Sequence, residues 1–390
     1  MNQPPKKLSK NIWLLGGVSL LNDISSEIIA PILPLLIKNL GGSGISIGII
    51  SGIRDCLTHL LKLLFGLLSD RQNSRKPFVF FGYLTSALFK GALMLATSWQ
   101  HILLFVGLER IGKGIRTSPR DVIIAQSTPG SIAKSLGIVR SFDNIGATIG
   151  SLIIFLLMWL YKLDLKIIVL LASSIALLAL IPLAFVEEPS RNITPTSATW
   201  TGLPSGVKQF AIINSIFHFG SISYMFLTLR IHDFSNIFSP VQNALLMYIT
   251  FNIVHALCAA PFGSIIDALS RRVCVLSGYT LYGLVMLGFW FAKTPPHFWI
   301  LFMLYGAALA LTDTSQRAFA IELAPQQRQG TSIGMIYASM GAAQIVGGLV
   351  CGLLWEYVAH EYIFILSVTT ALLSTWLLWL FGPTSDARAQ

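Results

Sequence analysis

The sequence predicts an all-α integral membrane protein with twelve transmembrane helices, in two six-helix halves related by a parallel pseudo-twofold repeat. The first observation is composition. The 390 residues are 54% hydrophobic and 11% charged, with a mean hydropathy of +0.70, whereas soluble domains carry about 25% charged residues. The second observation is that apolar stretches of about 20 residues, long enough to cross a hydrocarbon core of about 30 Å, recur along the chain.

The third observation is an internal repeat, in which short motifs recur 197 positions apart. The residues that recur are Gly66, Asp70 and Arg75, which reappear as Gly263, Asp267 and Arg272, and Thr117, Ser118 and Arg120, which reappear as Thr314, Ser315 and Arg317. An offset of about half the chain, without reversal, indicates two copies of one unit. Parallel repeats in a hydrophobic chain are typical of transporters built from two halves.

Hydrophobic periodicity predicts the helices in order. The expected ranges are 12–37, 46–69, 78–97, 101–122, 135–160, 165–186, 208–230, 241–266, 273–292, 298–320, 331–355 and 362–381. Pro31 and Pro34 should kink the first helix. The polar stretch 187–207, rich in Pro, Ser and Thr, is expected to link an N-terminal half, 1–186, to a C-terminal half, 208–390.

The distribution of Lys and Arg predicts the orientation. These residues gather in the loops on one side of the predicted topology, which is therefore expected to be cytoplasmic, with both termini on that side. The net charge of +10 does not indicate a nucleic-acid partner, because the basic residues lie at helix ends and inside helices. The four cysteines lack metal-ligand spacing, and no P-loop, zinc pattern or nucleophile elbow is present. We therefore expect neither an enzyme nor a cofactor.

The loop after the second predicted helix carries the most specific motif. The segment from Gly66 to Lys76, GLLSDRQNSRK, resembles the loop 2–3 signature of the major facilitator superfamily, although Asn73 and Ser74 stand where the family usually has Gly and Arg. The second copy, beginning at Gly263, resembles the degenerate repeat of loop 8–9. The resemblance covers essentially the whole chain. It implies the superfamily fold and a monomeric secondary transporter, in which two halves rock about a central site.

The finer pattern resembles a prokaryotic branch of the superfamily whose substrates are mostly unassigned. It lies in residues 21–27, LNDISSE, and residues 110–121, RIGKGIRTSPRD. This implies a location in the cytoplasmic (inner) membrane of a prokaryote. The fifth predicted helix carries Gly137, Gly146 and Gly150, whose spacing resembles the family's antiporter motif. The glycines are also consistent with close helix packing alone, so symport and antiport both stay open.

The resemblance implies a gate at the cytoplasmic loops. The residues assigned to it are Gly66, Asp70, Arg71, Arg75, Lys76, Gly263, Asp267, Arg271 and Arg272, together with Arg116, Arg120 and Arg317 near cytoplasmic helix ends. An anion such as Asp70 can lie beside the positive N-terminus of a helix. We expect Arg116 and Arg120 to emerge at the cytoplasmic surface. The alternative is that the basic residues only hold the loops inside.

Charged residues inside the predicted membrane segments are the candidates for proton coupling, because an ionisable side chain at that depth is expensive. Asp23 and Glu27 share one face of the first helix. With Glu109, Asp55 and His59 they form the predicted proton-coupling set. Two carboxylates at this depth either hold a proton or pair permanently with cations; Arg54 and Arg110 are the cations considered for the second case.

The substrate-binding candidates are Arg54, Arg110, Asn22, Arg140 and Asp143. Arg140 and Asp143 also have the spacing of a local i,i+3 pair, and Lys90 has no evident partner. A slight excess of cations favours an anionic or zwitterionic organic substrate, or a metal chelate. The second half carries fewer polar candidates inside its helices, namely His218, Arg230, His255, Asp313 and Arg317.

We therefore expect a secondary transporter of a small molecule, driven by a proton gradient. The alternatives are proton-driven efflux of amphipathic drugs and, in another class, a transporter-like receptor that moves nothing. Import or export, and H⁺ or Na⁺, stay open at this stage.

Overall fold

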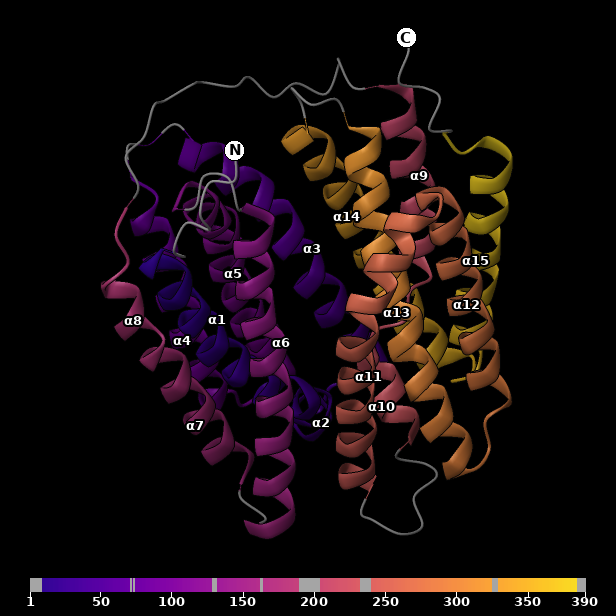
Figure 1. Ribbon diagram of the computed structural model, residues 1–390. Coiled ribbons are helices and arrows are strands. Elements are labelled where there is room, and N and C mark those ends of the chain that lie inside the picture. Colours follow the sequence, from indigo (N-terminus) through magenta and orange to yellow (C-terminus); the bar gives the residue numbers. More distant parts are fainter. Residues whose placement is uncertain are drawn as a thin grey trace. The chain divides into compact units, whose positions relative to one another are not determined.

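The computed structural model describes residues 9–70, 72, 74–127, 132–161, 164–188, 204–231, 240–324 and 329–383. All regular secondary structure in these ranges is helical (Figure 1). The chain packs as two compact units. The predicted division into 1–186, 187–207 and 208–390 stays a prediction, and residues 189–203 of its linker lie outside the described ranges.

The first unit comprises the described parts of Met1–Ile32, Leu61–Ala96 and Gln100–Thr196. Its helices are α1 (Lys10–Ile29), the end of α3 (Gly44–Asp70), α4 (Lys76–Ala92), α5 (Trp99–Ser127), α6 (Ile132–Leu156), α7 (Leu165–Leu178) and α8 (Leu180–Ala184). A 3₁₀ turn, Leu93–Leu95, extends α4, and a π-helical turn, Leu157–Tyr161, extends α6. The apolar core of this unit joins α1, α4, α5, α6 and α8 through side chains such as Ile12, Tyr83 and Ile124.

The second unit comprises the described parts of Leu33–Leu60, Thr97–Trp99 and Ser197–Gln390. Its helices are α2 (Leu33–Asn39), the beginning of α3, α9 (Ser205–Phe219), α10 (Tyr224–Ile231), α11 (Pro240–Ala268), α12 (Arg271–Phe291), α13 (Pro295–Leu323), α14 (Gln329–Tyr357) and α15 (Tyr362–Phe381). One of the points where the chain passes between the units therefore falls within α3, after Leu60.

Most of these helices can cross a membrane. Among the described residues, eleven helical segments are long and apolar enough to do so. Helix α5, at the position of the fourth predicted span, is not one of them, although its 29 residues are ample in length. The reason is its charge, since Glu109, Arg110, Lys113 and Arg116 follow within two turns. The fold thus places its most charged helix among membrane-spanning neighbours.

The first predicted helix is interrupted where the prolines predict a kink. Helix α1 ends at Ile29, a 3₁₀ turn spans Ala30–Ile32, and α2 continues from Leu33. Proline cannot donate the backbone hydrogen bond that a continuous helix requires, so the break at Pro31 and Pro34 has a local cause.

The prediction of one continuous helix over 208–230 is wrong. Helix α9 ends at Phe219, and α10 begins only at Tyr224. Hydroxyl groups replace the lost helical hydrogen bonds. The Ile222 N–H donates to the Tyr282 hydroxyl over 2.9 Å, and the Ser367 hydroxyl donates to the Gly220 carbonyl. Buried backbone groups in a membrane segment must be satisfied within the protein, and here tyrosine and serine do so.

Glycines let several helices touch backbone to backbone. A Cβ at Gly146 of α6 would lie 2.6 Å from the Leu20 carbonyl oxygen of α1. In the second unit, a Cβ at Gly348 of α14 would lie 2.5 Å from the Gly48 carbonyl oxygen of α3. Such spacing leaves no room for any larger residue, which is how small residues allow close helix packing in membranes. The packing interpretation of Gly146 is therefore confirmed.

Candidate functional site

The first unit encloses a cluster of charged side chains, which we call the charge cluster. It comprises Asp23 on α1, Lys90 on α4, Glu109, Arg110, Lys113, Arg116 and Arg120 on α5, and Asp143 on α6; each member is an electrostatic neighbour of at least one other. Four helices thus bring together residues that lie up to 120 positions apart in sequence. Five members are cationic and three are acidic, so the cluster carries an excess of positive charge.

Lys90 is the least exposed lysine of this cluster, with 3% of its surface accessible. Its ammonium group donates to the Ser26 hydroxyl over 2.8 Å and to the Ser25 hydroxyl over 3.2 Å. It also approaches the Asn22 carbonyl oxygen at 3.4 Å. The expectation that Lys90 has no partner is therefore wrong. Its partners are uncharged oxygens on one face of α1, which a search for acidic partners does not reveal.

Glu109 and Arg110 form the closest ion pair of the charge cluster. The Arg110 Nε lies 2.8 Å from Glu109 Oε2, and the two residues are 9% and 4% exposed. The Ser86 hydroxyl fixes this turn of α5 by donating to the Glu109 carbonyl oxygen over 3.0 Å. Within the described part of the chain, the second carboxylate oxygen of Glu109 has no hydrogen-bond partner. The two carboxylate oxygens of Glu109 therefore lie in different settings, one beside Arg110 and the other without a hydrogen-bond donor among the described residues.

Arg116 does not lie at the surface, so that expectation is wrong. It is 3% exposed, donates to the Ser86 hydroxyl over 2.5 Å, and places its guanidinium carbon 4.2 Å from the centre of the Tyr83 ring. Backbones of α4 and α5 approach closely here, since a Cβ at Gly112 would lie 2.6 Å from the Gly82 carbonyl oxygen. The aromatic face and the hydroxyl together make burial of a guanidinium tolerable.

Arg120 and Asp143 lie at one end of the charge cluster. Arg120 donates to the Ser19 hydroxyl over 2.8 Å and pairs with Asp121 at 3.0 Å. Asp143 lies 3.9 Å from Arg120 and 3.7 Å from Arg140. The predicted i,i+3 pair is thus confirmed, although the Arg140 side chain is 57% exposed and screened by solvent.

The acidic residues of α1 lie against α6. Asn22 donates its amide to Asp23 over 3.0 Å, and a Cβ at Gly146 or Gly150 would lie 3.3 Å and 3.0 Å from the Cβ atoms of Asp23 and Glu27, respectively. Asp23 is also an electrostatic neighbour of Lys90, Lys113 and Asp143. The carboxylates of α1 and the lysines therefore share one interior region.

Arg54 lies in the second unit. Its guanidinium donates to the Tyr224 hydroxyl over 2.6 Å. Tyr224 begins a row of aromatic rings in which Tyr248 follows at 5.0 Å, Phe251 at 5.9 Å and Tyr305 at 5.1 Å. A cation at the end of an aromatic row suits a ligand with an anionic group and an apolar body.

His59 and Asp55 lie on the same part of α3 as Arg54. The His59 ring stacks on Tyr337 with 5.2 Å between ring centres and 1° between planes. Asp55 is an electrostatic neighbour of His218 and Tyr305. The two residues therefore face helices of the second unit.

The predicted gate residues are only partly described. Arg71 lies outside the described residues, as do the side chains of Gly66, Asp70 and Asp267. In the first unit, Glu188 accepts the backbone N–H groups of Arg75 and Lys76, so a carboxylate caps the N-terminus of α4.

In the second copy of the loop, the arginines have local partners. Arg271 lies 3.4 Å from Glu322, and Arg272 donates to the Leu378 and Trp379 carbonyl oxygens over 2.8 Å. Arg317 is exposed, and an added Cβ at Gly263 would meet no atom within 4 Å.

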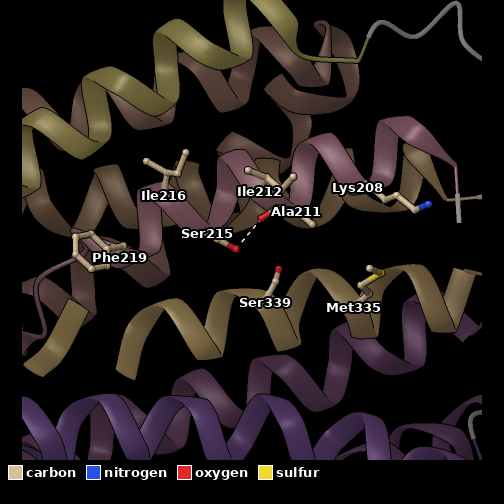
Figure 2. Close-up of a pocket in the computed structure, with 8 residues that line it drawn as sticks. All are labelled: Lys208, Ala211, Ile212, Ser215, Ile216, Phe219, Met335 and Ser339. Atoms are coloured by element: carbon tan, nitrogen blue, oxygen red, sulfur yellow. Dashed lines mark hydrogen bonds between the residues drawn. The ribbon is translucent and has the colours of Figure 1, made fainter. Parts of the chain in front are cut away.

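A cavity of about 800 Å³ lies between α9 and α14 in the second unit. Figure 2 shows Lys208 at one end of it, Phe219 at the other, and the Ser215 and Ser339 hydroxyls between them. The remaining lining residues are Ala211, Ile212, Ile216 and Met335. This volume is in the range of about 300–1,000 Å³ that is usual for small-molecule sites. The lining suits a largely apolar molecule.

Among the described residues, no group of three or more His, Cys, Asp or Glu side chains is arranged to hold a metal ion.

Comparison with known proteins decides the family. The sequence profile of the Major Facilitator Superfamily matches residues 15–229 and 210–390. The chain belongs to the Major Facilitator Superfamily. A curated relative in this superfamily, the uncharacterized MFS-type transporter MJ1317 of Methanocaldococcus jannaschii, is 39% identical over 383 residues, covering 97% of this chain and 96% of its own. The protein is thus a transporter of this superfamily and not an enzyme.

Solved superfamily structures share the fold. A POT family transporter in complex with 5-aminolevulinic acid superposes with a TM-score of 0.82 at 13% identity, covering 97% of each chain. The human organic anion transporter MFSD10 superposes with a TM-score of 0.71 at 18% identity, covering 96% of this chain and 100% of its own. At such identities the likeness extends to the fold alone, and substrate has to be argued from the site.

Proposed function

We propose that this superfamily member is a proton-coupled secondary transporter of a small organic anion or zwitterion. The excess of positive charge in the charge cluster carries this proposal. A buried group of cations that outnumbers its acidic neighbours is costly in a membrane protein, and a bound carboxylate or phosphate would remove part of that cost. Arg110, Lys113 and Lys90 are the residues best placed to attract such a group, and Arg54 supplies a further cation in the second unit.

Proton coupling is assigned to the carboxylates Asp23, Glu27 and Glu109, with Asp55 and His59 as further titratable groups. The observation in support is that Glu109 has one oxygen in an ion pair and, in the described structure, one oxygen without a hydrogen-bond partner. A carboxyl group in that setting can be either ionised or protonated while keeping its place. The proton gradient is then the only energy source, and no cofactor is required.

The topology proposed from the sequence accompanies this function. The chain lies in the cytoplasmic membrane of a prokaryote as a monomer, with both termini in the cytoplasm, because Lys and Arg concentrate in the loops on that side. The basic loops that contain Arg75 and Arg272 are proposed to act at the cytoplasmic gate.

Purified protein in liposomes tests the substrate class. A pH gradient is imposed, and lumenal pH is followed with a trapped indicator while organic anions, zwitterions, cations and neutral solutes are added in turn. We expect proton movement with anions or zwitterions. Arg110→Gln should abolish it, whereas Lys166→Gln, at an exposed position in the first turn of α7, should keep it. Proton movement with organic cations only would contradict the anion proposal.

Infrared difference spectra test the proton-coupling residues without any substrate. A carboxyl band that titrates between about pH 6 and 8 and disappears in Asp23→Asn or Glu27→Gln would identify a coupling acid. Spectra with no such band, in the wild type and in both variants, would show that these carboxylates are permanently ionised. They would then point to an exchanger or uniporter centred on Arg54 and Arg110.

A second candidate function is efflux of amphipathic compounds, which the cavity between α9 and α14 favours. Its apolar lining suits the hydrocarbon part of such a molecule. Ser339→Phe fills the middle of the cavity and should reduce transport of amphipathic compounds more than transport of small hydrophilic anions. Leu284→Phe, at a position on α12 that is 58% exposed, is the control. Absence of any solute flux in the wild type would instead favour a receptor that moves nothing.

A further inference from the structure

The interior of the second unit contains a chain of hydrogen bonds that the charge-based site does not use. It starts at Gln344 on α14, whose amide lies 3.4 Å from the Nδ1 atom of His218 on α9. The Nε2 atom of His218 lies 3.3 Å from the amide oxygen of Gln316 on α13. The Gln316 amide then donates to the Tyr279 hydroxyl over 3.1 Å. Tyr279 in turn donates to the Asn214 amide oxygen over 2.8 Å.

All bonds of this chain run in one direction. With the Gln344 NH₂ as donor, Nδ1 of His218 must be the acceptor, so a neutral ring carries its hydrogen on Nε2 and donates onward to Gln316. His218, Gln316, Tyr279 and Asn214 are each no more than 6% exposed, so water does not supply alternative partners. One group is left over. The amide oxygen of Gln344 is buried and has no hydrogen-bond partner among the described residues.

Protonation of His218 would change that arrangement. Both ring nitrogens would then donate, and the Nδ1–H would face the NH₂ of Gln344, donor against donor. Rotation of the Gln344 amide by about half a turn brings its oxygen to Nδ1–H, which gives a partner to both groups. We propose that His218 is a proton-binding site of the second unit, and that Gln344 reverses its hydrogen bond when the proton is taken up.

The surroundings of His218 act on its charged form in opposite directions. Burial of the ring opposes a charge, whereas Asp313 on α13 and Asp55 on α3 are acidic electrostatic neighbours that favour it. His255 of α11 lies 4.0 Å from Asp313 and is the further titratable group on that side. Tyr279 and Tyr282 contribute phenol groups from α12, and α15 contributes no Asp, Glu, Lys, Arg or His along its length.

His218 lies next to the C-terminal end of α9, so a change in its protonation occurs beside that helix end. Residue 219 is the last of α9, directly before the interruption at 220–223, and it lines the cavity between α9 and α14. At the same point α9 meets the backbone of α14, because a Cβ at Gly347 would lie 2.7 Å from the Phe219 carbonyl carbon. A changed bond between His218 and Gln344 therefore acts next to a point where the backbones of α9 and α14 are in close contact.

The test uses the full-length protein in lipid nanodiscs with ¹⁵N-labelled histidine and glutamine. The chain has seven histidines, and His218→Asn identifies the signal of His218 by its loss. We expect a neutral ring with hydrogen on Nε2 at about pH 8 and protonation of both nitrogens on acidification. The NH₂ signals of one glutamine, absent in Gln344→Leu, should change over the same pH interval.

The variant Gln344→Leu removes the acceptor of the protonated state. Loss of a hydrogen bond to a charged group should lower the ratio of protonated to neutral His218 at a given pH by about tenfold. The matched control is Gln209→Leu, at an exposed position on α9, the helix that carries His218. It should leave this ratio unchanged. If Gln344→Leu does not fold, the wild-type His218 signal, identified by His218→Asn, remains as the test, together with any glutamine NH₂ signal that changes over the same pH interval. A His218 ring that stays neutral from pH 8 to pH 5, or an equal ratio in both variants, would overturn the proposal.

This inference deepens the proposed proton coupling, but its test is independent of transport. Proton-driven transport with a His218 that never titrates would refute only the site in the second unit. A titrating His218 in a protein whose transport moves no protons would refute the proposed coupling instead.

Discussion

Replacement of Lys90 by methionine tests whether the charge cluster serves function at the expense of stability. Methionine has nearly the length of lysine and no charge, so Lys90→Met removes the ammonium group while filling most of its space. We expect the variant to remain about as stable as the wild type and to lose binding and transport of anionic substrates. The two effects separate a functional lysine from one that only holds α1 against α4.

The magnitude follows from the contacts of Lys90. Its two short hydrogen bonds, 2.8 Å to Ser26 and 3.2 Å to Ser25, contribute about 1.5–3 kcal/mol each as bonds to a charged donor. Against this stands a desolvation cost of several kcal/mol for a buried ammonium group that donates its hydrogen bonds to the uncharged oxygens of Asn22, Ser25 and Ser26. The variant also reduces the cationic members of the charge cluster from five to four, against three acidic ones. These terms nearly cancel, so the change in stability should be below about 2 kcal/mol.

Thermal unfolding in detergent and anion-driven proton movement in liposomes measure the two effects. The control is Lys166→Met, at an exposed position in the first turn of α7. Lys90→Met should keep a midpoint close to that of the control and lose at least about tenfold in kcat/KM for the anion, equivalent to 1.4 kcal/mol. A variant that unfolds far below the control but transports normally would refute this reasoning and make Lys90 a structural residue.

Three further predictions concern the second unit. Gly348→Leu should lower the thermal midpoint by several degrees, because its side chain would collide with the Gly48 carbonyl; an unchanged midpoint would contradict the close contact of α3 and α14. Arg54→Gln should raise KM for anionic substrates at least about tenfold, whereas Tyr224→Phe, which removes one acceptor at 2.6 Å, should have a smaller effect; equal effects would show that the hydroxyl, not the charge, matters. Glu356→Gln should destabilise by about 0.5–1 kcal/mol in unfolding measurements, because the carboxylate accepts the first N–H of α3 over 2.9 Å; if high salt leaves the difference unchanged, the charge is not its cause.

The sequence predicts the fold well because hydrophobic length and repeat spacing are local signals. The break near Pro31 is equally local, since the prolines that cause it lie in the segment that breaks. The break after Phe219 is different. Gly220 alone permits either a helix or a turn, and the turn is stabilised by Tyr282 and Ser367, which lie 60 and 147 positions away. Periodicity in residues 208–230 contains no information about those partners.

The candidate site was predictable as a set of residues but not as a network. Charged residues in apolar helices are visible in the sequence, and the proximity of Arg140 to Asp143 follows from spacing alone. The environment of Arg116 does not, because a tyrosine on α4 and a hydroxyl supply what a search for acidic partners would miss. For the same reason His218 looks like an isolated histidine in the sequence, although two glutamines and a tyrosine connect it across four helices. Uncharged hydrogen-bonding partners are too common to be recognised before the fold is known.

The repeat shows how the two copies have diverged in chemistry while keeping one scaffold. At the offset of 197, three charged positions of the first copy are apolar in the second: Lys90 corresponds to Leu287, Glu109 to Gly306 and Arg110 to Ala307. The hydrogen-bond chain of the second copy has no equivalent in the first either, since His218 corresponds to Leu21, Tyr279 to Gly82 and Gln316 to Pro119.

A fold needs none of these polar side chains, because the duplicated helices pack through glycines and apolar residues in both copies. Burying polar side chains costs free energy. The first copy offsets this cost with interactions between charged groups, and the second with hydrogen bonds that involve neutral amides. Both copies therefore bury polar side chains at a cost in free energy, but they do so at different positions. Such a difference is expected if the two copies have separate functional roles. The anion proposal therefore belongs to the first copy and the proton on His218 to the second, and the variants Lys90→Met and Gln344→Leu test them independently.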